Sequence, residues 1–174
     1  MHVRRLSRAD ISLIWTIDRS EVIEGIYALE EGELVLRPEH FEAAGWPPGE
    51  ADLYGPILLD CYDRGGWFCG LFEGNRLIGV AVLESKFIGR DRDQLQLKFL
   101  HVGNGYRGQG LGTKLFDLAR DEARRRDARQ LYISATPSQN TIDFYLRRGC
   151  HVTPEPDPAL FALEPEDIHL ECDV

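Results

Sequence analysis

The chain has 174 residues, 43% of them hydrophobic and 28% charged, a composition that favours one folded domain over 1–174 and excludes a disordered chain or a multidomain protein. Twenty Lys and Arg against 29 Asp and Glu give a formal net charge of −9, which argues against a nucleic-acid partner. No apolar run approaches the ~20 residues that cross a bilayer, so we expect no signal peptide, no membrane partner and a cytoplasmic location.

The N-terminal third carries weak local signals. A short strand is predicted over 2–6, and a helix over 8–23, because its apolar residues recur at spacings of three and four. Residues 24–48 mix glycine, proline and acidic residues, and their structure stays open. A helical pattern resumes from about 51 to 62.

The remaining two thirds carry stronger signals. Two apolar runs, 67–72 and 77–83, flank a Gly-Asn pair and predict a β-hairpin whose second strand is covered on both faces. The later predicted elements, in chain order, are a strand over 94–102, a helix over about 110–127, a strand over 131–135, a helix over 139–148 and strands near His151 and Ile168. Hairpins followed by strand-helix-strand units predict the α/β class, with a mixed sheet and helices on both faces.

The four cysteines and the histidines show no metal-ligand spacing. Cys61, Cys69, Cys150 and Cys172 include no C-x-x-C pair, so we expect buried free thiols rather than a zinc site. No metal site is predicted.

Charge is distributed unevenly along the chain. Residues 18–63 hold twelve acidic side chains against two basic ones, whereas residues 90–129 hold ten basic against six acidic ones. If both regions border one cleft, an anionic ligand would bind in the basic region and a cationic ligand would face the acidic one. Solvated faces without any ligand are the alternative that charge alone leaves open.

A glycine-rich turn follows the strand over 94–102. Five glycines fall within residues 103–112, where they allow backbone N–H groups to approach an anion at a helix N-terminus. A phosphate group is the expected occupant, and a flexible loop with a helix cap is the alternative. The P-loop pattern fails here, while G-x-G-x-x-G matches at Gly103, Gly105 and Gly108 but lacks a ribose-binding acid after the strand over 131–135.

A third pattern fits the turn better. Arg107 to Gly112 reads R-x-x-G-x-G, and a second segment contains Asn140, a Phe144-Tyr145 pair and Gly149. Both resemble the signatures of the GCN5-related N-acetyltransferase (GNAT) family. Two departures stand out: Asn140 precedes Tyr145 by five positions rather than the family's commoner seven, and Cys150 replaces the usual aromatic residue.

The resemblance implies a fold and a cofactor site. The fold would be a GNAT-like mixed, mostly antiparallel twisted sheet of six to seven strands, with acetyl-CoA in a V-shaped gap between the strands over 94–102 and 131–135. Backbone groups beside this gap would bind the pantetheine arm, and the glycine turn would bind the pyrophosphate. The implied cofactor-binding residues are Leu100, His101, Val102, Arg107, Gly108, Gln109, Gly110, Leu111, Gly112, Thr113, Asn140 and Tyr145.

Tyr145 and Glu84 are the predicted catalytic residues. A thiolate leaving group with a conjugate-acid pKa of ~8.5 needs a proton, which a tyrosine in the position of Tyr145 can donate. The acceptor ammonium must lose a proton before it attacks, and Glu84 is the first candidate base, ahead of Glu21 and Glu24. The alternatives are a core role for Tyr145, a solvated surface position for Glu84, and water as the base.

The predicted function is therefore an N-acetyltransferase that moves acetyl from acetyl-CoA to a primary amine by direct attack in a ternary complex. The acidic region favours a small cationic acceptor. A CoA-binding regulatory module without turnover and an NAD(P)-dependent oxidoreductase remain as alternatives, and a homodimer is possible.

Overall fold

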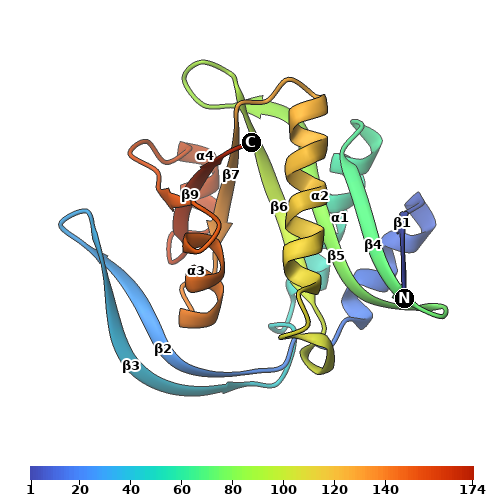
Figure 1. Ribbon diagram of the computed structural model, residues 1–174, viewed down its shortest axis with the longest axis horizontal. Coiled ribbons are helices and arrows are strands. Elements are labelled where there is room, and N and C mark those ends of the chain that lie inside the picture. The colour runs from blue at the N-terminus through green and yellow to red at the C-terminus, as the bar shows by residue number, and fades with distance from the viewer.

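A seven-stranded sheet with the order β1-β4-β5-β6-β7-β9-β8 forms the body of the computed structural model, which describes residues 1–174 (Figure 1). Its strands are β1 (His2–Arg5), β4 (Trp67–Glu73), β5 (Arg76–Ile88), β6 (Gln94–Val102), β7 (Gln130–Ala135), β8 (His151–Val152) and β9 (Ile168–Asp173). Every neighbouring pair is antiparallel except β6 and β7, which are parallel. The predicted mixed, mostly antiparallel sheet is confirmed.

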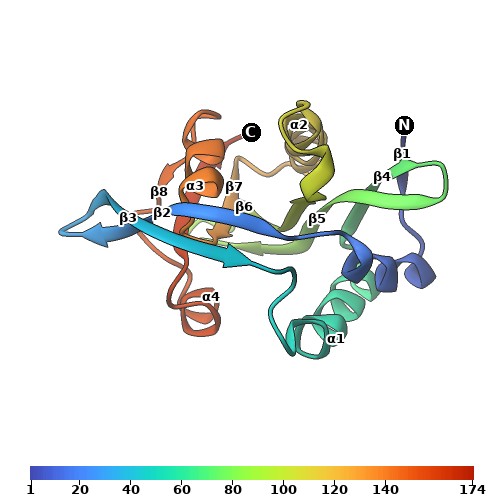
Figure 2. The same cartoon turned by 90° about the horizontal axis from the view of Figure 1, so that it is seen from below.

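Helices cover both faces of this sheet. In Figure 2, α2 (Leu111–Arg125) and α3 (Gln139–Leu146) lie on one face, and α1 (Glu50–Asp63) and α4 (Pro158–Leu163) lie on the other. Each face has its own buried apolar cluster, and the central strand β5 contributes to both, as expected for a strand covered on two sides. No helix is long and apolar enough to cross a membrane.

The predicted helix over 8–23 is wrong beyond its first half. A 3-10 helix, η1 (Arg8–Thr16), ends at Ile17, whose backbone is extended and whose carbonyl accepts a hydrogen bond from the Trp46 indole at 2.9 Å. The chain then enters strand β2 (Glu21–Glu30), because Val22 and Ile23 pair with Glu42 and Phe41 across the hairpin. Long-range pairing here overrides the weak helical spacing.

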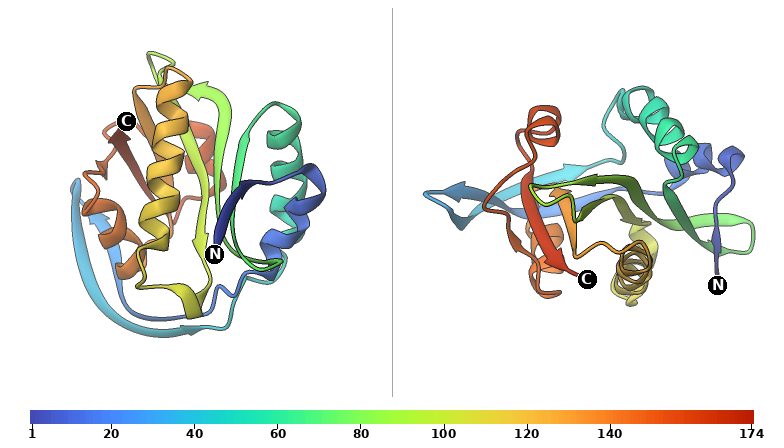
Figure 3. Two further views of the ribbon diagram at one scale, coloured as in Figure 1. Left: turned by 45° about the vertical axis from the view of Figure 1, so that its right-hand side comes forward. Right: turned by 90° about the horizontal axis from the view of Figure 1, so that it is seen from above.

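The open segment forms a long hairpin of β2 and β3 (Glu33–Ala43), which makes its own two-stranded sheet beside α3 (Figure 3). Two contacts of Tyr27 attach this hairpin to the body. Its N–H donates to the Pro137 carbonyl at 2.8 Å, and its hydroxyl donates to the Asp143 carboxylate at 2.7 Å. The hairpin is therefore held against the α3 side of the molecule.

The cysteine expectation is corrected for two of the four residues. Cys150 and Cys172 form a disulfide, while Cys61 and Cys69 are buried free thiols. The pairing of His151 with Glu171 between β8 and β9 places the two flanking cysteines opposite each other, although 22 positions separate them in the sequence.

The gap between β6 and β7 positions the candidate site. The two strands pair only where residues 94–96 face residues 130–132, and beyond this point they diverge. On its other side β6 stays paired with β5 as far as Val102. The edge of β6 that faces β7 therefore has no strand partner over residues 97–102, and its backbone groups are available to a ligand, except for the Val102 carbonyl, which accepts from Arg107 Nε.

Candidate active site

A cleft of about 950 Å³ lies at this gap, between the ends of β6 and β7, the start of α2, helix α3 and the base of the β2–β3 hairpin. The structure brings all of the predicted cofactor-binding residues to its wall except Gln109 and Leu111. These ten residues come from three separate segments of the sequence, and the strand divergence gathers them.

The glycine turn presents free backbone donors to the cleft. The N–H groups of residues 108–113 make no hydrogen bond within the protein. Gly108 and Gly110 have φ angles of 75° and 77°, a left-handed conformation that glycine adopts without strain. Consecutive free N–H groups at the N-terminus of α2 form a cradle for an anion such as a diphosphate.

Two side chains of the signature motifs meet at Glu21. The Asn140 amide donates to the Glu21 carboxylate at 3.1 Å, and the Arg107 guanidinium lies 3.9 Å from its other oxygen. The Arg107 Nε also donates to the Val102 carbonyl at 3.0 Å. Glu21 lines the cleft, so the hairpin contributes a carboxylate to the same wall as Asn140 and Arg107.

Arg148 adds a positive charge that the sequence analysis did not assign to the site. Its guanidinium lies 3.4 Å above the Phe144 ring and donates to the Thr113 hydroxyl. Its Nε is the one buried side-chain polar atom of the protein without a hydrogen-bond partner. An unpaired donor beside the free amides of the turn suits an anionic ligand, so the residues present fit the diphosphate of acetyl-CoA.

Tyr145 lines the cleft with its ring embedded in the core. The residue is 6% exposed, and the ring packs against Phe144 and Phe116 at centroid distances of 5.2 and 6.1 Å. Its hydroxyl makes no side-chain hydrogen bond within the protein and is not among the buried unpartnered atoms, so it is accessible from the cleft. Burial raises the pKa of the phenol, which therefore stays protonated at neutral pH.

Glu84 does not line the cleft. Its carboxylate accepts hydrogen bonds from Arg64 at 2.7 and 3.1 Å and from the Ser85 N–H at 2.8 Å, and it lies 3.5 Å from the Lys98 ammonium. Burial opposes ionisation of Glu84, but Arg64, Ser85 and Lys98 outweigh it and lower its pKa to about 2. A carboxylate with this pKa is a poor proton acceptor at neutral pH.

Of the other groups that the sequence analysis considered, some line the cleft and some do not. Glu24 bonds to His40 at 3.0 Å and does not line the cleft. His101 does line it, packed against Trp46 and Phe99 at 4.8 and 5.2 Å. Burial, together with the charges of Arg19 and Arg107, lowers the pKa of His101 well below 6.5, so the imidazole is uncharged.

Ser134 was also missed by the sequence analysis. It lies near the end of β7, lines the cleft and donates a hydrogen bond to Asp167 at 3.0 Å. The only signal for Ser134 was its position at the end of a predicted strand beside the predicted gap. Asp167 carried no signal at all, because it precedes a strand predicted only by its approximate position.

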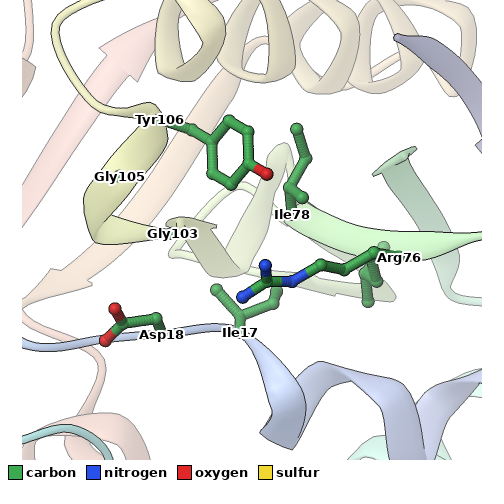
Figure 4. Close-up of a pocket in the computed structure, with 8 residues that line it drawn as sticks. Ile17, Asp18, Arg76, Ile78, Gly103, Gly105 and Tyr106 are labelled. Atoms are coloured by element: carbon green, nitrogen blue, oxygen red, sulfur yellow. The ribbon is translucent and has the colours of Figure 1, made fainter. Parts of the chain in front are cut away.

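A second pocket of about 340 Å³ lies on the outer side of the turn. Figure 4 shows the Tyr106 ring on one side of it and the Arg76 side chain on the other, near Ile17 and Asp18. Gly103 and Gly105 line this pocket and not the cleft, so two glycines of the dinucleotide pattern lie away from the anion cradle. The structure contains no group of His, Cys, Asp or Glu side chains that could hold a metal ion.

Three solved structures share this fold over nearly the whole chain. A nourseothricin acetyltransferase matches with a TM-score of 0.74 and 18% identity, over 99% of this chain and 97% of that one. The PaiA N-acetyltransferase from Thermoplasma acidophilum, in complex with coenzyme A, matches with a TM-score of 0.66 and 19% identity over 99% and 98%. A structure from Bacillus anthracis str. Ames in complex with acetyl coenzyme A matches with a TM-score of 0.73 and 16% identity over 99% and 98%. No curated protein matches the sequence.

At these identities the solved structures establish the fold alone, and the sequence itself provides the assignment. The family model of the GNAT acetyltransferases matches residues 24–150, which include the glycine turn, Asn140 and Tyr145. This span is well over half of the chain. The chain belongs to the acetyltransferase (GNAT) family, and it is an acetyltransferase with acetyl-CoA as its acetyl donor.

Proposed function

We propose that the protein acetylates a primary amine by direct attack in a ternary complex, with Tyr145 as the general acid. The observation that carries this proposal is the unpaired Tyr145 hydroxyl, which shares a cleft with the free N–H groups of residues 108–113. The same observation favours a working enzyme over a CoA-binding module without turnover. We also propose that residues 1–174 form one N-acetyltransferase domain, while the homodimer and the cytoplasmic location stay predictions.

Each wall of the cleft has a distinct part in this reaction. Acetyl-CoA supplies a thioester carbonyl that an uncharged amine can attack. The amides of residues 108–113 and Arg148 bind its diphosphate, and the free edge of β6 over residues 97–102 orients the pantetheine arm. Tyr145 donates its proton to the sulfur as the carbon–sulfur bond breaks.

The hairpin wall supports a small cationic acceptor. Glu21 and Glu42 line the cleft from the hairpin, and the acidic side chains of that hairpin outnumber its single arginine, Arg37. Acidic side chains at the entrance raise the local concentration of a cationic substrate. Nourseothricin, a polyamine and a peptide with a free N-terminus are suitable first acceptors to assay for thiol release.

Glu84 has no catalytic part in this proposal. Its oxygens are bound to Arg64, Ser85 and Lys98, and its pKa of about 2 leaves it ionised without affinity for the ammonium proton. We assign it to the stability of the sheet instead.

The substitution Tyr145→Phe tests the proposal. Loss of the general acid should lower kcat by ~10² while the Kd for coenzyme A changes less than about twofold, because the ring and its packing remain. Steady-state thiol release gives kcat, and calorimetry gives the Kd. Tyr106→Phe is the matched control, since Tyr106 lies outside the cleft and donates to Glu73, and it should leave kcat unchanged.

Two outcomes would contradict the proposal. Unchanged kcat in Tyr145→Phe removes Tyr145 from the mechanism. Absence of thiol release with any amine, in a protein that still binds coenzyme A, would favour the module without turnover.

A further inference from the structure

A hydroxyl in the wall of the cleft is hydrogen-bonded to a half-buried carboxyl group outside it. Ser134 lines the cleft, and its Oγ donates to the Asp167 Oδ2 at 3.0 Å. The sheet holds this contact in place, because Ser134 pairs with His169 and Ala135 pairs with Ile168 between β7 and β9. Asp167 directly precedes the paired Ile168, so its position follows from strand register rather than from a mobile loop.

Asp167 belongs to a pair of carboxyl groups. Its N–H donates to the Glu164 carbonyl at 3.2 Å just after α4, and the Glu164 carboxylate accepts a hydrogen bond from the Tyr54 hydroxyl of α1. The ionisable groups that face this pair from the surrounding elements are Arg19 before β2, Glu50 and Tyr54 on α1, Tyr132 on β7, Tyr145 on α3 and His169 on β9. Arg19 is already paired with Glu50 at 3.0 Å, so neither Asp167 nor Glu164 has an ion-pair partner of its own.

The pKa of Asp167 is shifted in the opposite direction to that of Glu84. Burial, followed by the nearby charge of Glu164, raises the pKa of the Asp167 carboxyl well above its usual range. A carboxyl group that titrates in the neutral range can both take up and release a proton under working conditions. The negative charge of Asp167 also helps to raise the pKa of the Tyr145 phenol.

We propose that Ser134 and Asp167 form the path by which the acceptor ammonium loses its proton. The inference rests on the proposed function, because it assigns the deprotonation step of that same reaction. Ser134 touches the acceptor and Asp167 acts through it, as a proton-relay residue.

In this reaction the ammonium proton moves through Ser134 to Asp167. The ammonium N–H bond breaks, its proton passes to the Ser134 oxygen, and the Ser134 proton passes to the Asp167 carboxylate, which leaves the serine unchanged. The electron pair that remains on nitrogen forms the new bond to the acetyl carbon, while the carbon–sulfur bond breaks and Tyr145 protonates the sulfur. The second N–H proton restores Tyr145, and Asp167 releases its proton to water, so one ammonium and one thioester yield an amide, a thiol and one proton.

His101 is the competing base, and the structure disfavours it. It lines the same cleft, but Arg19 and Arg107 add to burial in suppressing its positive charge. Burial disfavours the protonated, charged form of an imidazole, whereas it favours the protonated, neutral form of a carboxyl group. The imidazole is therefore the weaker proton acceptor here.

The pH profile of kcat/KM separates these possibilities. An acceptor whose ammonium has a pKa of ~10 should show an acid limb near the pKa of Asp167 in the wild type, because the enzyme removes the proton itself. In Asp167→Asn and in Ser134→Ala the limb should move upward toward ~10, and kcat/KM at pH 7 should fall by ~10². Ser134→Thr keeps the hydroxyl and should retain the wild-type limb.

The matched control is Asp173→Asn. Asp173 lies at the other end of β9 and accepts one side-chain hydrogen bond, from Gln130 at 3.0 Å, but it is not in the cleft wall. Its substitution should leave the limb in place. An unchanged limb in both Asp167→Asn and Ser134→Ala overturns the proposal, and a limb lost only in His101→Ala assigns the base to His101 instead.

A second measurement does not need turnover. Carboxyl-carbon NMR of the protein without ligands should show Asp167 titrating in the neutral range, and Ser134→Ala should raise its pKa further, because the carboxylate loses a donor. Titration of Asp167 near pH 4 would overturn the inference even if acetyl transfer is confirmed. Normal Asp167 titration without acetylation of any amine would contradict the proposed function alone.

Discussion

Two buried carboxyl groups show how local donors set the chemistry of a residue. Glu84 receives hydrogen bonds from Arg64 and Ser85 and lies beside Lys98, whereas Asp167 receives one hydroxyl and faces Glu164. Burial raises both pKa values, and only Glu84 has enough positive partners to reverse the effect. Glu84 therefore stabilises the sheet as a permanent anion, and Asp167 can exchange protons.

Glu84→Gln should lower the free energy of unfolding by about 3 kcal/mol at pH 7, because it leaves Arg64 and Lys98 without their buried partner. A carboxylate with a lowered pKa contributes stability above its unfolded pKa of 4.5 and loses it as the pH falls toward about 2. The difference between wild type and variant should therefore shrink over this range, as denaturant unfolding at several pH values would show.

Asp60→Asn is the control for this substitution. Asp60 also pairs with Arg64, at 2.8 Å, but its side chain is 67% exposed. Its loss should cost less than about 0.5 kcal/mol. An equal loss in the two variants would contradict the role assigned to burial, and a lower kcat in folded Glu84→Gln would return Glu84 to the mechanism.

At the scale of the element, the backbone conformation of the turn before α2 determines how its N–H groups are presented. The N–H groups of residues 108–113 are free of partners in a turn where Gly108 and Gly110 adopt left-handed φ angles of 75° and 77°. A side chain at either position costs ~1–2 kcal/mol in that conformation. The turn can avoid this strain by changing shape, which would disperse the donors.

Gly110→Ala should therefore weaken coenzyme A binding by ~10-fold, equivalent to ~1.4 kcal/mol, with a smaller loss of thermal stability. Gly105→Ala is the control in the same turn: its φ is not left-handed, and an added Cβ would meet no atom within 4 Å. Calorimetry on both variants measures the effect. Equal Kd values for Gly110→Ala and wild type would exclude the cradle as the diphosphate site.

The elements also differ in how far local sequence predicts them. The strand over 94–102 and the helix that begins at 139 were predicted with the correct starts, because apolar periodicity and glycine punctuation are local signals. The β2–β3 hairpin was not predicted, since its strands carry many acidic residues and depend on pairing with each other and on the contacts of Tyr27. Helix α4 was missed as well, because six residues give no periodicity to read.

For the whole molecule, folding concentrates charge that is diffuse in the sequence. The chain has a net charge of −9, yet the turn, Arg107 and Arg148 bring positive charge to the cleft, and Glu21 and Glu42 of the hairpin bring negative charge to it. Charges of both signs in one cleft suit a ternary complex in which an anionic donor and a cationic acceptor bind side by side. Net charge alone argued against a nucleic-acid partner, and it indicated neither the donor nor the acceptor.

Salt should accordingly weaken acceptor binding. Raising the ionic strength from about 0.05 to about 0.5 M shortens the Debye length to a few ångströms and should raise the KM of a polycationic acceptor several-fold. A monoamine of similar size is the control and should change less. Glu42→Gln should reduce the salt dependence for the polycation, and identical salt dependence for both acceptors would contradict a cationic preference set by the hairpin.

The sequence by itself determined the family, the sheet with its helices, the glycine-rich turn and the helix that carries Tyr145. These features depend on periodicity, on glycine and on motifs whose residues lie within a few positions of one another. Only the tertiary structure decided which distant side chains meet, and therefore which carboxyl groups have shifted pKa values and which cysteines form a disulfide. Ser134 meets Asp167 across 33 positions, Glu84 is bound by Arg64 across 20 positions, and Cys150 joins Cys172 across 22 positions. Such contacts depend on strand register and on the packing of distant segments, and pKa values follow from the neighbours that packing supplies.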